Sequence, residues 1–225
     1  MSDSGVRDSP VLEAEFVARA IEDPTWDIGN RALYALCREF PRHERAPEIV
    51  AKIWLIGRSY AAAIERGQQS EQLGDDFYTE VVAPQMLASG IDAWLDDLRT
   101  KPPETHEAIL RVHRQVMRLF SQMSGLNKRS LASKYLHFHL PGHFYIFDSR
   151  AENVVKFFTR GKAISVVPGV AQDQQYGDFV SRCNVLAKEI AGLLGRAVTC
   201  RELDKVALAY ANAHGRLALR ERRFI

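Results

Sequence analysis

Apolar residues recur every three or four positions through almost the whole chain, and this spacing is the strongest constraint on its fold. The clearest run is Ile109, Val112, Val116, Leu119 and Met123, which fall on one face of an α-helix. Prolines and glycines separate such runs and are typical of helix ends. We therefore predict an all-α fold, a compact domain of two helical layers, with an extended stretch at 144–147 and a short strand at 164–167.

Charge is distributed unevenly along the chain, although the net charge is only +2. Residues 1–100 hold 10 Lys and Arg against 18 Asp and Glu, whereas residues 101–225 hold 20 against 10. The sign changes at Lys101-Pro102-Pro103, a sequence typical of a linker. We expect an acidic N-terminal layer (1–100) and a basic C-terminal layer (101–225) within one structural domain. The basic layer favours a polyanionic partner such as DNA, and the mutual attraction of the two layers is the alternative explanation.

The sequence shows no feature of a membrane or secreted protein. It has no run of about 18 apolar residues that would span a bilayer, and its first residues lack the basic and then apolar order of a signal peptide. We expect a cytoplasmic protein with no membrane partner. The three cysteines, widely spaced and odd in number, favour reduced buried thiols over disulfides or a zinc site. They are Cys37, Cys183 and Cys200.

Three histidines lie close together in the sequence and superficially resemble a set of metal ligands. They are His137, His139 and His143. On a helix the first two point about 200° apart, so they do not share one ion. We expect neither a metal nor another cofactor. His137 instead favours contact with a phosphate or substrate, and the other two favour hydrogen bonds within the surrounding loop.

The segment 124–151 carries the most information about function. A helix predicted over 130–140 places Ser130, Lys134 and His137 on one polar face, which suits a ligand or solvent. The start of this helix combines unpaired backbone N–H groups with positive charge, and such a helix end is suited to binding phosphate. The residues around it are Gly125, Asn127, Lys128 and Arg129.

A second helix is predicted to begin at Ser149, near the end of this segment. Asp148 precedes Ser149, and the sequence Ser149-x-x-Glu152 fits a capping box. On these residues alone, Asp148 is predicted to accept hydrogen bonds at the start of the helix.

The sequence Ser130-Leu131-Ala132, followed by Phe144-x-Ile146-Phe147-Asp148-Ser149-Arg150-Ala151, resembles the core of the helix-hairpin-helix DNA glycosylase superfamily, particularly its 8-oxoguanine-glycosylase-like branch. The resemblance covers about residues 105–160. It implies a hairpin and helix that hold the DNA backbone. It also implies a hydrolase that cleaves the N-glycosidic bond of a damaged or modified base.

The resemblance also implies roles for individual residues. Asp148 would be the catalytic aspartate that stabilises an oxocarbenium-like sugar and orients water. Ser130 stands where lyase-type members carry a nucleophilic lysine, which implies hydrolysis by water unless Lys134 or Lys128 supplies an amine. The chain lacks a cluster of four cysteines, so no iron–sulfur cofactor is proposed.

The remaining candidates concern binding. The residues expected at a DNA-facing surface are Gly125, Asn127, Lys128, Arg129, His137 and Arg150. The candidates for a pocket that receives an extruded base are Asn30, Arg58, Tyr60 and the ring of Tyr135. Two alternatives stay open: a non-catalytic nucleic-acid-binding module of the same fold, in which Asp148 is only a cap, and a helical protein-interaction domain whose acidic half binds a basic partner.

Overall fold

The computed structural model describes residues 11–66, 76–100, 106–166 and 173–221, with side chains described as far as residue 215. Within these ranges the chain is helical and contains no strand, so the all-α prediction is confirmed. The elements are α1 (Ala14–Glu22), α2 (Asp27–Glu39), α3 (Ala46–Ser59), the π-helix η1 (Phe77–Val82), α4 (Ala83–Leu87), α5 (Ile91–Thr100), α6 (His106–Ser124), α7 (Arg129–His139), α8 (Ser149–Phe158), α9 (Gln174–Leu194) and α10 (Cys200–Glu221).

The expected strand at 164–167 is wrong for its described residues, 164–166, which are irregular. Val166 is exposed, and the described part of the chain offers no strand with which it would pair. The three cysteines are free and buried, as predicted. Among the described helices, none combines the length and the apolar character needed to cross a bilayer.

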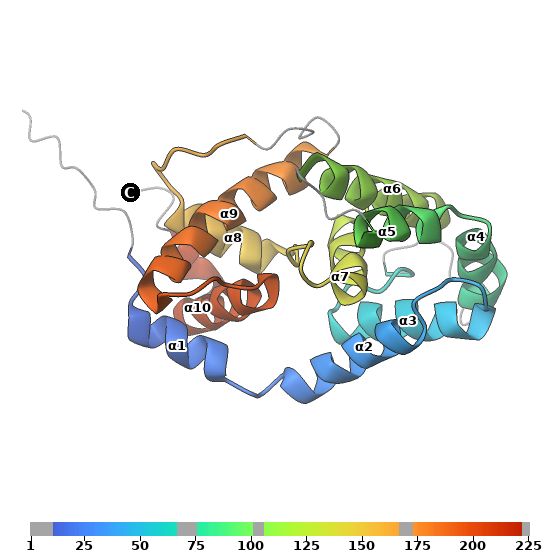
Figure 1. The fold of residues 1–225 in the computed structure, drawn as a ribbon, viewed down its shortest axis with the longest axis horizontal. Coiled ribbons are helices and arrows are strands. Elements are labelled where there is room, and N and C mark those ends of the chain that lie inside the picture. The colour runs from blue at the N-terminus through green and yellow to red at the C-terminus, as the bar shows by residue number, and fades with distance from the viewer. Residues whose placement is uncertain (1–10, 67–75, 101–105, 167–172, 222–225) are drawn as a thin grey trace, which may run out of the picture.

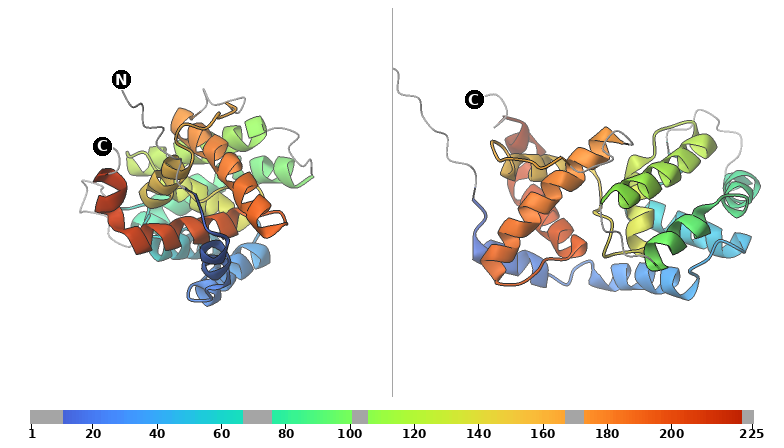
Figure 2. Two further views of the ribbon diagram at one scale, coloured as in Figure 1. Left: turned by 90° about the vertical axis from the view of Figure 1, so that its left-hand side faces the viewer. Right: turned by 45° about the horizontal axis from the view of Figure 1, so that its top comes forward.

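The helices form two lobes (Figure 1). The first lobe contains α2 to α7 with η1, and the second contains α1, α8, α9 and α10. Although α1 comes first in the chain, it packs on α9 and α10. Figure 2 shows the lobes beside each other, joined by the segment between α1 and α2 and by the segment between α7 and α8. The second lobe is therefore built from both ends of the chain.

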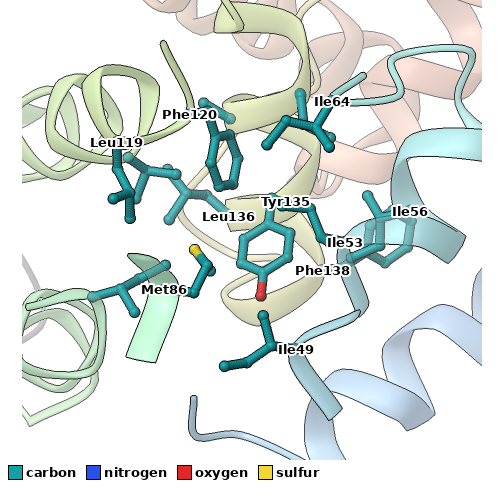
Figure 3. Packing of buried hydrophobic residues seen from close by; sticks show 14 of the residues in the cluster. Ile49, Ile53, Ile56, Ile64, Met86, Leu119, Phe120, Tyr135, Leu136 and Phe138 are labelled. Carbon is teal, nitrogen blue, oxygen red and sulfur yellow. The ribbon is translucent and has the colours of Figure 1, made fainter. Parts of the chain in front are cut away.

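The core of the first lobe surrounds α7. Tyr135 and Leu136 of this helix are fully buried and lie among apolar side chains of α3 and α6, including Ile49, Ile53 and Phe120 (Figure 3). Every residue of α7 from Leu131 to His139 is buried, so this helix is enclosed on all sides. A helix in this position packs its apolar face into one core and turns its polar face towards the junction of the two lobes.

The division of the core does not coincide with the change in charge near residue 100. Helices α5 and α6, on either side of residues 101–105, both belong to the first lobe. The predicted linker Lys101-Pro102-Pro103 lies outside the described residues. The two cores separate instead between Phe144, which packs in the first, and Phe147, which packs in the second.

Candidate functional site

Two polar residues of α7, Lys134 and His137, are buried rather than exposed to solvent. The side chain of Lys134 is only 2% exposed, and His137 is fully buried. Burial of a lysine is costly unless its ammonium group has partners, so the surroundings of Lys134 hold the information about this site.

Lys134 lies between a serine and an aspartate. Its Nζ donates a hydrogen bond of 2.7 Å to Ser130 Oγ, one turn earlier on α7, and lies 4.0 Å from Asp148 Oδ2. Burial lowers the pKa of Lys134, and the negative charge of Asp148 opposes this effect. The three residues predicted to be catalytic are therefore brought together in the structure.

The two carboxylate oxygens of Asp148 have different partners. Oδ1 accepts hydrogen bonds of 2.9 Å from the backbone N–H groups of Arg150 and Ala151, so Asp148 is the N-cap of α8, as predicted. Oδ2 faces Lys134. The side chain is one-fifth exposed, so it is in contact with solvent. Glu152 does not complete a capping box, because its carboxylate pairs with Lys156.

Two further residues of this site, Arg201 and Asp204, come from α10. They form an ion pair in which Asp204 is 2% exposed. Burial raises the pKa of Asp204 to about 6, with a further contribution from the charge of Asp148, while Arg201 and Lys134 oppose the shift. Among the described residues, Asp204 Oδ1 and Arg201 Nε have no hydrogen-bond partner.

Neither residue of α10 was predicted from the sequence. Asp204 follows Leu203 and precedes Ala207 by three positions, so it lies on the buried face of its helix. An acidic residue on an apolar helical face was the available signal.

Tyr60 and Asn30, which were expected in a base pocket, also lie at this junction. The Tyr60 hydroxyl donates a hydrogen bond of 2.6 Å to Asn30 Oδ1. Lys134 Nζ lies 5.7 Å from the centre of the Tyr60 ring, and an Arg201 N–H lies 3.5 Å from the Tyr60 hydroxyl oxygen. We call the group at this junction the interlobe cluster. It consists of Tyr60, Ser130, Lys134, Asp148, Arg201 and Asp204.

The other two expected pocket residues lie elsewhere. Arg58 forms an ion pair with Glu65, with 2.5 Å between Nη2 and Oε1. Tyr135 points into the core of the first lobe, where its hydroxyl lies 2.6 Å from His43 Nε2. The structure therefore brings Tyr60 and Asn30 towards the candidate catalytic residues but places Arg58 and Tyr135 apart from them.

The residues expected to bind the DNA backbone are largely engaged inside the protein. Lys128 is buried, and its Nζ donates hydrogen bonds to the carbonyl oxygens of Ala63 (3.3 Å) and Arg66 (2.8 Å). Arg129 Nε donates to both carboxylate oxygens of Asp173. These two cations stabilise the fold around the start of α7 and leave little positive charge free for a phosphate.

The turn between α6 and α7 retains some of its expected features. Gly125 has a left-handed backbone conformation with φ of 69°, which a glycine adopts without strain. Asn127 Oδ1 accepts a hydrogen bond from the backbone N–H of Arg129 at the start of α7. Arg150, partly exposed, lies 3.4 Å from Asn212 Oδ1 and is a remaining candidate for phosphate contact.

His137 has both ring nitrogens occupied in the protein interior. Nδ1 donates to the carbonyl oxygen of Phe144 (2.7 Å), so Nε2 accepts from the hydroxyl of Tyr34 (2.6 Å). This tautomer is neutral, and burial lowers the pKa of His137 to about 4. His137 therefore supports the α7–α2 contact rather than lying at a DNA-facing surface.

Of the other two histidines, both expected to form hydrogen bonds within the surrounding loop, only His143 has a partner among the described residues. His143 Nε2 lies 3.4 Å from the Leu98 carbonyl oxygen, whereas neither ring nitrogen of His139 has a hydrogen-bond partner within the described chain. The described residues contain no group of three or more His, Cys, Asp and Glu side chains arranged to hold a metal ion.

The buried histidines predict that the protein loses stability in mild acid. Burial lowers the pKa of His43 and of His137 to about 4, against about 6.5 when unfolded. Between these values the unfolded chain binds more protons, so the free energy of unfolding falls as the pH drops from about 6.5 to about 4, by up to about 1.4 kcal/mol per pH unit for each histidine.

Urea unfolding at pH 7 and pH 5 measures this effect. His137→Gln is expected to reduce the difference, and the exposed His214→Gln is expected to preserve it. Equal stability of the wild type at the two pH values would contradict the prediction.

Comparisons with known proteins found no relative of this chain. No protein-family model matches it, and neither a curated protein nor a solved structure matches it.

Proposed function

We propose that this protein is a DNA N-glycosylase that hydrolyses the bond between a damaged or modified base and its sugar. The observation that carries the proposal is the pairing of a partly exposed carboxylate, Asp148, with a buried ammonium group, Lys134, at the junction of two lobes. Cleavage of an N-glycosidic bond develops positive charge on the sugar, which a nearby carboxylate stabilises.

The different partners of the two Asp148 oxygens support this chemistry. Because Oδ1 is fixed by two backbone N–H groups, the orientation of Oδ2 is also fixed before a substrate binds. In the proposed step the C1′–N bond breaks, and its electron pair leaves with the base. Oδ2 stabilises the cationic sugar and orients a water molecule. The water oxygen bonds to C1′, and one of its protons is transferred to the departing base.

Lys134 is proposed to hold the carboxylate rather than to attack the sugar. With 2% of its side chain exposed and with Ser130 and Asp148 as neighbours, its Nζ has little access to a substrate carbon. The ammonium group instead lies beside Oδ2 and helps to hold the carboxylate in place. Lys128 is also a poor nucleophile, because its Nζ donates to two backbone carbonyl oxygens of the first lobe.

Base release from a panel of DNAs tests the proposal. Single-stranded and duplex substrates carrying oxidised, alkylated, deaminated or bulky modified bases are incubated with the full chain, and free base is measured. We expect release from at least one class. Borohydride, which reduces an imine between lysine and C1′ to a stable bond, is expected to trap no protein–DNA adduct. An adduct that disappears in Lys134→Met would replace water with Lys134 as the nucleophile.

A second candidate function is a nucleic-acid-binding module without catalysis. The observation that favours it is the pair of hydrogen bonds by which Asp148 caps α8, because these alone account for an aspartate at this position. Binding to DNA that weakens with salt, together with no base release from any substrate in the panel, would favour this alternative.

A further inference from the structure

A large cleft lies apart from Lys134 and Asp148, between α2, the end of α7 and the start of α10. Its volume is about 960 Å³, near the upper end of the range for small-molecule sites in proteins. Figure 1 shows α2 below α7 in the first lobe, and Arg201 of α10 brings in the second lobe, so elements of both lobes bound the cleft. Neither Lys134 nor Asp148 lines it.

The lining of this cleft is positively charged. Four arginines and no acidic residue contribute to it: Arg31, Arg38, Arg99 and Arg201. Arg99 pairs with Asp96 and Arg201 pairs with Asp204, but Arg31 and Arg38 are exposed and form no ion pair or hydrogen bond within the described chain. They are seven residues apart on α2 and therefore share one face of that helix. Two free guanidinium groups on one face, two helical turns apart, are suited to binding a phosphate through charged hydrogen bonds.

The wall beside these arginines is aromatic. Tyr34 lies between Arg31 and Arg38 on the same helix, and its ring centre is 4.8 Å from that of Phe138. Tyr34 is partly exposed, so part of its ring is open to the cleft. A planar ligand would gain from packing against such a ring and from contact with an arginine.

The deeper wall contains polar atoms whose hydrogen-bonding capacity is unused. His139 lines the cleft and is only 8% exposed, and both of its ring nitrogens lack a partner among the described residues. The same holds for Nε of Arg201. Leaving such groups unpaired costs free energy, so a ligand that reaches these buried nitrogen atoms would gain affinity by satisfying them. A heteroaromatic ring with donors and acceptors on its edge has the required chemistry.

We propose that this cleft binds a nucleoside phosphate, with the phosphate on Arg31 and Arg38 and the base against Tyr34 near His139. The same chemistry is offered by a free nucleotide and by a nucleotide within a DNA strand. The inference stands independently of base excision at Asp148, because Arg31, Arg38 and Tyr34 lie outside the interlobe cluster and only Arg201 is shared with it.

Calorimetric titration of the full chain tests this inference with four probes: a purine nucleoside monophosphate, the corresponding nucleoside, inorganic phosphate and a short single-stranded oligonucleotide. We expect the monophosphate to bind at least tenfold more tightly than either the nucleoside or inorganic phosphate. Arg31→Gln/Arg38→Gln is expected to weaken its binding by at least tenfold. Both side chains are exposed, so the melting temperature of this variant should match that of the wild type.

A matched control replaces two exposed arginines that do not line the cleft, Arg19→Gln/Arg45→Gln, and is expected to bind the monophosphate as the wild type does. If only the oligonucleotide binds and Arg31→Gln/Arg38→Gln weakens it, the nucleotide comes from a strand. Equal binding of nucleoside and monophosphate, binding that survives loss of both arginines, or no binding of any probe would each overturn the inference. The same titrations on Asp148→Asn distinguish binding in the cleft from glycosylase activity. Binding in the cleft is expected to be unchanged in this variant, whether or not the glycosylase proposal is correct.

Discussion

Replacing Asp148 with asparagine is expected to lower base release by about 10²–10⁴-fold, because the substitution removes the negative charge proposed to stabilise the cationic sugar. Asparagine caps a helix about as well as aspartate. The amide oxygen of the new side chain would still accept from the N–H groups of Arg150 and Ala151, so α8 should stay intact. Activity and stability should therefore separate in this one variant.

The measurement compares single-turnover base release with thermal unfolding for the wild type and for Asp148→Asn. Glu152→Gln is the matched control, since it neutralises a carboxylate in the first turn of the same helix, where Glu152 pairs with Lys156. We expect the control to retain activity within a few-fold of the wild type. If Asp148→Asn keeps full activity, or if Glu152→Gln loses as much activity, Asp148 is not the catalytic carboxylate of the reaction.

Replacing Leu136 with alanine is expected to lower the free energy of unfolding by about 2–5 kcal/mol, the range for a buried leucine. Leu136 is fully buried on α7, in the middle of the first core (Figure 3). The substitution removes apolar contacts and leaves a cavity that the surrounding helices α3 and α6 fill only in part. Because a protein of this size has a stability of about 5–15 kcal/mol, this is a large fraction of the total.

Urea unfolding measures this loss, with Leu193→Ala as the matched control. Leu193 lies on α9 and is 42% exposed, so the same change of side chain should cost much less there. Similar losses in the two variants would mean that α7 does not occupy the centre of the first core.

The sequence determined the local structure of this protein. Helical spacing identified most of the helices, because a helix that packs on a core repeats its apolar residues every three or four positions. The cap of α8 by Asp148 was also readable, since an N-cap aspartate accepts hydrogen bonds from backbone groups two and three residues later. Ser130 and Lys134 were placed together for the same reason, because they are four residues apart on one helix.

Only the tertiary structure shows which of the predicted site residues are available to bind a ligand and which are engaged inside the protein. Lys128 and Arg129 have the charges of a phosphate site, yet their partners, Ala63, Arg66 and Asp173, are more than 40 residues away in the sequence. No local pattern reveals such contacts.

The same limit applies to the arrangement of the lobes. The contact of α8 with α10 brings Arg201 and Asp204 to the interlobe cluster, and the packing of α1 on α9 and α10 joins the two ends of the chain. Helical periodicity tells which face of a helix is buried, but it does not tell against which helix that face packs, because apolar contacts are not directional. The candidate catalytic aspartate was therefore visible in the sequence, whereas Arg201 and Asp204 beside it became visible only when the helices were placed in space.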